Sequence, residues 1–114
     1  MKSSLGDRAR LQHIQDAILE IVSYTNNISF EDFKSNSMAL FASVKQLEII
    51  GEAANNITEH FKKLYNEIEW RKIIGLRNLL VHEYFGIDET VVWGIIKKDL
   101  PKLQEEVKQI LKQI

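Results

Sequence analysis

The sequence predicts an all-α protein, an antiparallel bundle of about four main helices with short helical pieces between them. Apolar residues recur every three or four positions over most of the 114 residues, and no stretch alternates as a half-buried strand does. Only one proline occurs, and there is no repeat or low-complexity segment. Helices with one apolar face bury it by packing on each other, and this length fits a single domain, residues 1–114.

The first expected helix covers residues 5–24, and polar residues at 26, 27 and 29 end it. Ser29 and Asp32 then have the spacing of a capping box, in which each side chain bonds the backbone of the other residue. This spacing predicts a short second helix with an aromatic face. The apolar residues expected to be buried in the two helices are Leu11, Ile14, Ile18, Ile21, Val22, Phe30 and Phe33.

A second long helix is expected at residues 38–56, after a polar boundary at residues 35–37. Within it, Gly51 has no side chain and would let another helix come close. Thr58 is placed to cap a short helical piece that ends near Asn66. The apolar residues with helical spacing in these segments are Leu40, Val44, Leu47, Ile50, Ala54, Ile57, Phe61, Leu64 and Tyr65.

The remaining helices are expected at residues 70–84 and from Asp88, a plausible N-cap, to the C-terminus. Proline costs about 3 kcal/mol inside a helix but is tolerated in a first turn, so Asp99 is expected to cap a new or kinked helix ahead of Pro101. The expected core residues of the first segment are Ile73, Ile74, Leu76, Leu80 and Val81, and the expected buried face of the last helix is Leu103, Val107, Ile110 and Leu111. The apolar residues that follow Asp88 are Val91, Val92, Trp93, Ile95 and Ile96.

Composition excludes several classes of protein. The absence of cysteine excludes disulfides, thiolate catalysis and cysteine-based zinc sites. A formal net charge of -1 argues against coating nucleic acid through bulk electrostatics, so any RNA contact is expected to be local. No apolar run approaches the roughly 20 residues of a spanning helix. The charged residues Asp7 and Arg8 stand where a signal peptide needs its apolar stretch, and we expect a cytoplasmic protein without a membrane segment.

The chemically informative stretch is residues 77–84, which contain Arg77, Asn78, His82 and Tyr84. Arginine stays charged and forks onto phosphate oxygens, and histidine, with a reference pKa of about 6.5, exchanges a proton near neutrality. A phosphodiester is cut without metal when a base deprotonates a 2'-hydroxyl, an acid protonates the departing 5'-oxygen and a cation holds the phosphorus. An isolated arginine and histidine are most often surface groups, but the whole octet favours a site.

On an unbroken α-helix, Arg77 and His82 would point about 140° apart. Two arrangements would bring them together. In the first, the helix ends near His82, an arrangement that Gly86 just beyond the motif favours. In the second, another copy of the chain completes the site. A pair of chains is chemically attractive, because one histidine fills only one proton-transfer role at a time.

Two acidic residues, Glu48 and Glu52, stand four apart beside Gly51. They are placed to orient Arg77, or at least one of them simply faces solvent; the two interpretations weigh about equally. No Glu-x-x-His pair occurs, and His13 and His60 lack ligand spacing, so we expect no metal site.

Taken together, these segments resemble the HEPN superfamily, specifically the HepT toxins of HepT/MntA toxin-antitoxin pairs. The RxxxxHxY signature, with asparagine after the arginine, is matched by Arg77, Asn78, His82 and Tyr84. The residues that look like the family's middle-helix signature, its pre-motif turn and its last helices are 47–54, 67–70, 92–93 and 99–101. The likeness covers nearly the whole chain.

The resemblance implies a HEPN-type bundle that dimerises through its motif helices and acts as a metal-independent endoribonuclease with no cofactor. Arg77 and His82 would be catalytic, and Asn78 would order the pair or contact the phosphate. An MntA-like nucleotidyltransferase antitoxin would neutralise the toxin by adding AMP groups to Tyr84. The alternatives are a non-catalytic HEPN module that binds nucleotide or RNA for the transferase, and a purely structural interaction protein.

Overall fold

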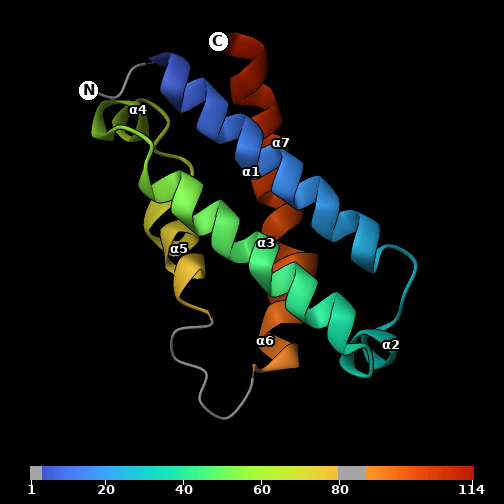
Figure 1. Ribbon diagram of the computed structural model, residues 1–114. Helices are drawn as coiled ribbons and strands as arrows, with labels where there is room; N and C mark the ends of the chain where they lie inside the picture. Colours follow the sequence, from blue (N-terminus) through green and yellow to red (C-terminus); the bar gives the residue numbers. More distant parts are fainter. Residues whose placement is uncertain (1–3, 80–86) are drawn as a thin grey trace.

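The computed structural model describes residues 4–79 and 87–114, and all regular secondary structure in these two ranges is helical (Figure 1). The predicted all-α class is therefore confirmed. The elements in chain order are α1 (Ser4–Thr25), α2 (Phe30–Lys34), α3 (Ser37–Asn55), α4 (Glu59–Leu64), α5 (Trp70–Ile74), the 3₁₀ segment η1 (Gly75–Asn78), α6 (Glu89–Gly94), the π segment η2 (Ile95–Asp99) and α7 (Leu100–Gln113).

Helix α3 is the centre of the arrangement: it packs along α1 on one side and against α5 and η1 on another, while α7 packs against α1 (Figure 1). The predicted core residues of α1 and α3 are buried, including Leu11, Ile14 and Leu47 at 0% exposure. Three of the described apolar residues singled out in the sequence are exposed instead: Val22 of α1 (39%), Leu64 of α4 (61%) and Val91 of α6 (51%). In the last turns of α1 the buried positions are Ile21 and Thr25, four residues apart on one face, and Val22 lies to the solvent side of them. None of the helices in the described ranges is both long and apolar enough to cross a membrane.

The predicted capping residues act as expected at three helix starts. Ser29 and Asp32 form the capping box of α2, and Thr58 and Asp88 accept backbone hydrogen bonds at the starts of α4 and α6. Between α1 and α2, Asn27 has a φ of 65°, a left-handed conformation that asparagine tolerates better than most residues. Local chemistry therefore fixes these boundaries.

The segment that carries Arg77 differs from the continuous α-helix predicted for residues 70–84. The α-helix ends at Ile74, and Gly75–Asn78 forms a tighter 3₁₀ turn that continues with a hydrogen bond from the Leu79 N–H to the Leu76 carbonyl (3.3 Å). Glycine is a poor residue for a helix interior, and 3₁₀ geometry is common where an α-helix ends. The unbroken α-helix assumed for the wheel angle of about 140° is therefore interrupted before Arg77, while His82 lies outside the described residues.

The C-terminal helices run on without the new cap expected at Asp99. The Asp99 backbone is already helical and its side chain makes no capping bond; its carboxylate instead accepts a hydrogen bond from Lys72 Nζ (3.2 Å). Proline cannot donate an N–H and its ring crowds the carbonyl four residues earlier, here that of Lys97. Lys97 lies within the wider π turn Ile95–Asp99, which accommodates Pro101 in the first turn of α7.

A long-range polar contact joins α1 to the start of α4. Asp7 is 3% exposed, and its carboxylate oxygens accept hydrogen bonds from the Thr58 N–H (2.9 Å) and hydroxyl (2.7 Å). Thr58 also accepts from the Phe61 N–H at 3.2 Å. A buried carboxylate is costly without hydrogen-bond partners. The contact between Asp7 and Thr58 therefore fixes the start of α4 against α1.

Candidate active site

Arg77 lies on the 3₁₀ turn η1. The α5–η1 segment that includes this turn packs against the core at both of its ends. At the beginning, Trp70 is buried and its indole N–H donates to the Tyr65 carbonyl at 3.0 Å. At the end, Leu76 is buried and Leu79 packs partly against the core. Apolar anchors before and after the arginine leave its own side chain on the outer side of the turn, 38% exposed.

Gly51 of α3 lies directly under Arg77. A Cβ atom built on Gly51 would be 3.0 Å from both the Arg77 Cβ and the Ile74 carbonyl oxygen, and closer still to the Arg77 backbone nitrogen. The other two glycines in the described helical segments η1 and α6, Gly75 and Gly94, would meet nothing within 4 Å. The close approach predicted for Gly51 is confirmed, and its partner is the segment that carries Arg77.

Glu52, the neighbour of Gly51, forms an ion pair with Arg77. The distance from Arg77 Nη1 to Glu52 Oε2 is 3.9 Å, and the Glu52 side chain is 61% exposed. An ion pair this long and this exposed stabilises the fold by at most about 1 kcal/mol. It still restrains the direction of the guanidinium, while leaving N–H groups accessible to an anion.

A cavity of about 280 Å³ opens beside this pair. It is lined by Lys45, Glu48, Ile49, Glu52 and Arg77. The structure therefore brings both predicted acidic residues to the arginine: Glu52 in ion-pair contact and Glu48 on the same wall. Two cations and two carboxylates line the cavity, and the Arg77 N–H groups that do not face Glu52 remain for phosphate oxygens.

The other predicted site residues have different outcomes. Asn78 follows Arg77 on η1; its side chain is exposed and has no hydrogen-bond partner among residues 4–79 and 87–114. His82 and Tyr84 lie outside the described residues, so their convergence with Arg77 stays a prediction. The described chain reaches Leu79 on one side of them and Ile87 on the other, and both pack partly against the core.

A carboxyl with a shifted pKa, that of Glu106 in α7, lies away from the Arg77 cavity. Glu106 of α7 has its pKa raised above the usual range mainly by burial, which outweighs the nearby Lys102, with Glu67 and Glu69 adding repulsion. This carboxyl lies in the small crevice between α5 and α7, where Lys72 and Asp99 also lie. It does not line the Arg77 cavity.

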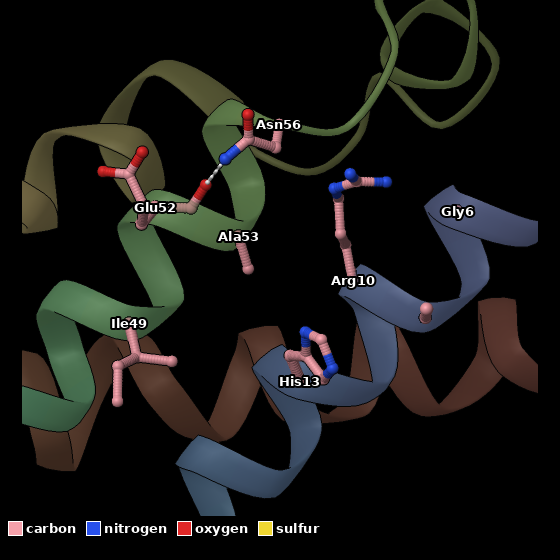
Figure 2. Close-up of a pocket in the computed structure, with 8 residues that line it drawn as sticks. Gly6, Arg10, His13, Ile49, Glu52, Ala53 and Asn56 are labelled. Atoms are coloured by element: carbon pink, nitrogen blue, oxygen red, sulfur yellow. Dashed lines mark hydrogen bonds between the residues drawn. The ribbon is translucent and has the colours of Figure 1, made fainter. Parts of the chain in front are cut away.

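Sequence reasoning missed one group of polar side chains. Arg10 and His13 of α1 face α3 across a groove that shares Ile49 and Glu52 with the Arg77 cavity (Figure 2). Their spacing of three places them on one helix face, a signal that was present in the sequence. Which part of α3 they would face depends on the packing of two helices distant in sequence, and no local pattern reports that.

Comparison with known proteins identifies the family. The family model described as "Ribonuclease HepT-like" matches residues 14–110. The chain belongs to the HepT-like family. This confirms the resemblance inferred from the motif residues.

The chain is 42% identical over 102 residues to "Probable ribonuclease HepT" of Thermococcus cleftensis, which covers 90% of this chain and 93% of the relative. It is 38% identical over 100 residues to "Putative RNase MJ1380" of Methanocaldococcus jannaschii, covering 88% and 92%. A protein of Caldanaerobacter subterraneus named "Putative RNase TTE0752" is 38% identical over 106 residues, covering 93% and 95%. No solved structure matches the chain.

Proposed function

We propose that this HepT-like protein is a metal-independent endoribonuclease toxin that cuts RNA with Arg77 and His82. The observation that carries the proposal is the placement of Arg77: a permanent cation on the 3₁₀ turn η1, in a long ion pair with Glu52, and lining an open cavity. The ribonuclease names of relatives that align along most of their length support the same chemistry.

In the proposed reaction, a histidine takes the proton of a ribose 2'-hydroxyl, and the 2'-oxygen bonds to phosphorus as the bond from phosphorus to the 5'-oxygen breaks. An acid returns a proton to the departing 5'-oxygen. Arg77 holds the negative charge that builds on the phosphoryl oxygens, and the amide of Asn78 donates to the same phosphate or orders the pair. Glu52 keeps the guanidinium directed at the cavity until RNA arrives, with Glu48 on the same wall.

Two copies of the chain are proposed to form the working site, so that two His82 side chains supply base and acid. Helix α3 offers a surface for pairing: Met38 (83% exposed), Phe41 (55%) and Ile49 (37%) are apolar and exposed. At about 100° per residue they fall within roughly 80° of each other, on one face. Exposed apolar patches of this kind mark interaction surfaces, and this one leads into the Arg77 cavity through Ile49.

The proposed activity is tested with purified protein and RNA in the presence of a chelator. We expect the unaltered chain to cleave and the His82→Ala variant to lose roughly 100-fold or more of the rate, the usual scale for a proton-transfer group. Product ends carrying a 2',3'-cyclic phosphate would identify attack by the 2'-hydroxyl. Equal cleavage by both proteins would rule out this site, and RNA binding without cleavage would favour the non-catalytic alternative.

Regulation is proposed to act through Tyr84. A nucleotidyltransferase antitoxin of the MntA type would transfer AMP from ATP to its hydroxyl with release of pyrophosphate, adding negative charge and bulk a short distance along the chain from Arg77. The phosphodiester would occupy the guanidinium and repel RNA.

We expect the peptide containing Tyr84 to gain the mass of one or more AMP groups when the chain is co-expressed with such a transferase, and cleavage to stop. The Tyr84→Phe variant, which keeps the ring and lacks the acceptor oxygen, should stay unmodified and active under the same conditions. If the Tyr84→Phe variant lost its RNA cleavage on co-expression with the transferase, modification of Tyr84 would not be the switch.

A further inference from the structure

A second cavity, of about 480 Å³, lies between α1 and α3. Figure 2 shows Arg10 and His13 of α1 on one side of it and Ile49, Ala53 and Asn56 of α3 on the other. Its size falls within the roughly 300–1,000 Å³ typical of small-ligand sites. Its lining combines small and apolar residues with the polar side chains of Arg10, His13, Glu52 and Asn56.

This groove neighbours the Arg77 cavity and shares two lining residues with it. Ile49 and Glu52 line both, and α3 lies between α1 and the α5–η1 segment (Figure 1). A strand bound at Arg77 therefore reaches Arg10 by crossing the exposed ridge of α3 at these two residues. The two cavities are therefore adjacent sites along the proposed path of the strand.

Within the described ranges, the Arg10 cation has no carboxylate partner. Arg10 is half-buried, and no carboxylate of residues 4–79 or 87–114 lies within 4.0 Å of its guanidinium. Glu52, the acid that lines the groove, points away from Arg10 in Figure 2 and is paired with Arg77 instead. A partly buried cation without an anion is a favourable place for a phosphate, because five N–H donors are fixed in a planar fork.

We propose that the groove between α1 and α3 is a second RNA-contact site of the ribonuclease, one that binds the nucleotide flanking the cut linkage. This inference rests on the proposed function. Arg10 binds the flanking phosphate, the His13 ring N–H bonds to the sugar-phosphate edge, and the apolar side chains of Ile49 and Ala53 take the face of the base. Proteins bind single strands through this combination of cations that follow the backbone with apolar platforms under the bases.

A protein occupant fits the groove less well. Of the three exposed apolar residues proposed for pairing of two copies, Met38, Phe41 and Ile49, only Ile49 also lines the groove, and Met38 lies about 22 Å from Ala53 along the helix at 1.5 Å per residue. Within the described ranges the Arg10 guanidinium has no carboxylate partner, and the groove shares Ile49 and Glu52 with the Arg77 cavity. These features suit a polyanion that must reach Arg77.

The test measures binding of a fluorescent 2'-O-methyl RNA of about ten nucleotides by anisotropy, because this strand has no 2'-hydroxyl and cannot be cut. Arg8→Glu is the matched control for Arg10→Glu: it makes the same change of charge two residues away, but Arg8 is directed to α7, where it donates to the Leu111 carbonyl at 3.3 Å. We expect Arg10→Glu to weaken binding about tenfold or more and Arg8→Glu to weaken it less than about threefold. For Arg10→Ala, the salt dependence should lose roughly one phosphate contact.

Cleavage measurements separate this inference from the proposed function. With a long RNA, Arg10→Ala should raise KM and leave kcat within about twofold; with a dinucleotide that spans only the cut linkage, it should change neither. Equal effects of Arg8→Glu and Arg10→Glu would overturn the groove while leaving the activity intact. If Arg10→Glu lost the homodimer or the antitoxin complex while its RNA binding stayed unchanged, the groove would be a protein-docking surface and the RNA-contact proposal would be overturned. An unaltered chain that neither binds nor cuts RNA would overturn the proposed function itself.

Discussion

Arg77→Ala is expected to lower kcat/KM for RNA by about 100-fold or more, the effect of removing one group that stabilises transition-state charge. The fold should tolerate the change. The side chain is 38% exposed and its one ion pair, with Glu52, is long, so the free energy of unfolding should fall by less than about 1 kcal/mol. Initial rates on a fluorogenic RNA and urea unfolding curves measure the two quantities separately.

Two further variants make this result specific. Arg77→Lys keeps the positive charge and loses the planar fork, so it should recover only part of the activity. Arg71→Ala removes an exposed arginine from α5, just before η1, and should change the rate less than threefold, roughly the effect of one surface charge. Similar losses from Arg71→Ala and Arg77→Ala would mean that the cavity beside Glu52 has no special role.

The sequence was most informative where structure is decided by neighbours along the chain. The caps at Ser29, Thr58 and Asp88 are local hydrogen bonds whose spacing is visible in the sequence, and all three form. The buried faces of α1 and α3 follow from helical periodicity in the same way. The missing side chain at Gly51 predicted a close helix approach, although the sequence did not identify Arg77 as the residue that packs there.

Features that depend on the relative rotation of distant segments were not predicted. The Asp7 carboxylate meets Thr58 across 51 positions of sequence, and an acidic residue in a first helical turn is more often a solvated group that favours the helix dipole. The change to a 3₁₀ turn at Gly75 and the π turn before Pro101 are adjustments to packing and to a missing donor. The groove beside Arg10 exists only because α1 and α3 present these particular faces to each other.

Gly51→Ala should be the most damaging of the three changes Gly51→Ala, Gly75→Ala and Gly94→Ala. The added Cβ would meet the backbone nitrogen of Arg77, and would lie 3.0 Å from its Cβ and from the Ile74 carbonyl oxygen. Backbone and Cβ atoms cannot swing aside as the end of a flexible side chain does, so η1 must move away from α3. A displacement of about 1 Å at a catalytic group costs on the order of 100-fold in rate, and overpacking costs about 1–3 kcal/mol of stability.

The chain provides matched controls for this experiment. Gly75→Ala and Gly94→Ala add the same methyl group to helical segments where nothing lies within 4 Å, and Gly75 has the helical φ and ψ of -60° and -20°. Both should be neutral or stabilising by up to about 1 kcal/mol, because alanine is the better helix residue. Gly75→Ala is the sharper control, since it lies two residues from Arg77 on the same turn.

The decisive measurement for Gly51→Ala is kcat at a temperature well below its melting midpoint, where nearly all molecules are folded. A lower kcat in a fully folded protein, with RNA binding by the groove beside Arg10 retained, would show that Gly51 acts through the position of Arg77. If folded Gly51→Ala cleaves RNA as fast as the Gly75→Ala control, the contact between α3 and η1 does not set the geometry of the reaction, and the position of the arginine must be fixed by the motif residues beyond Leu79.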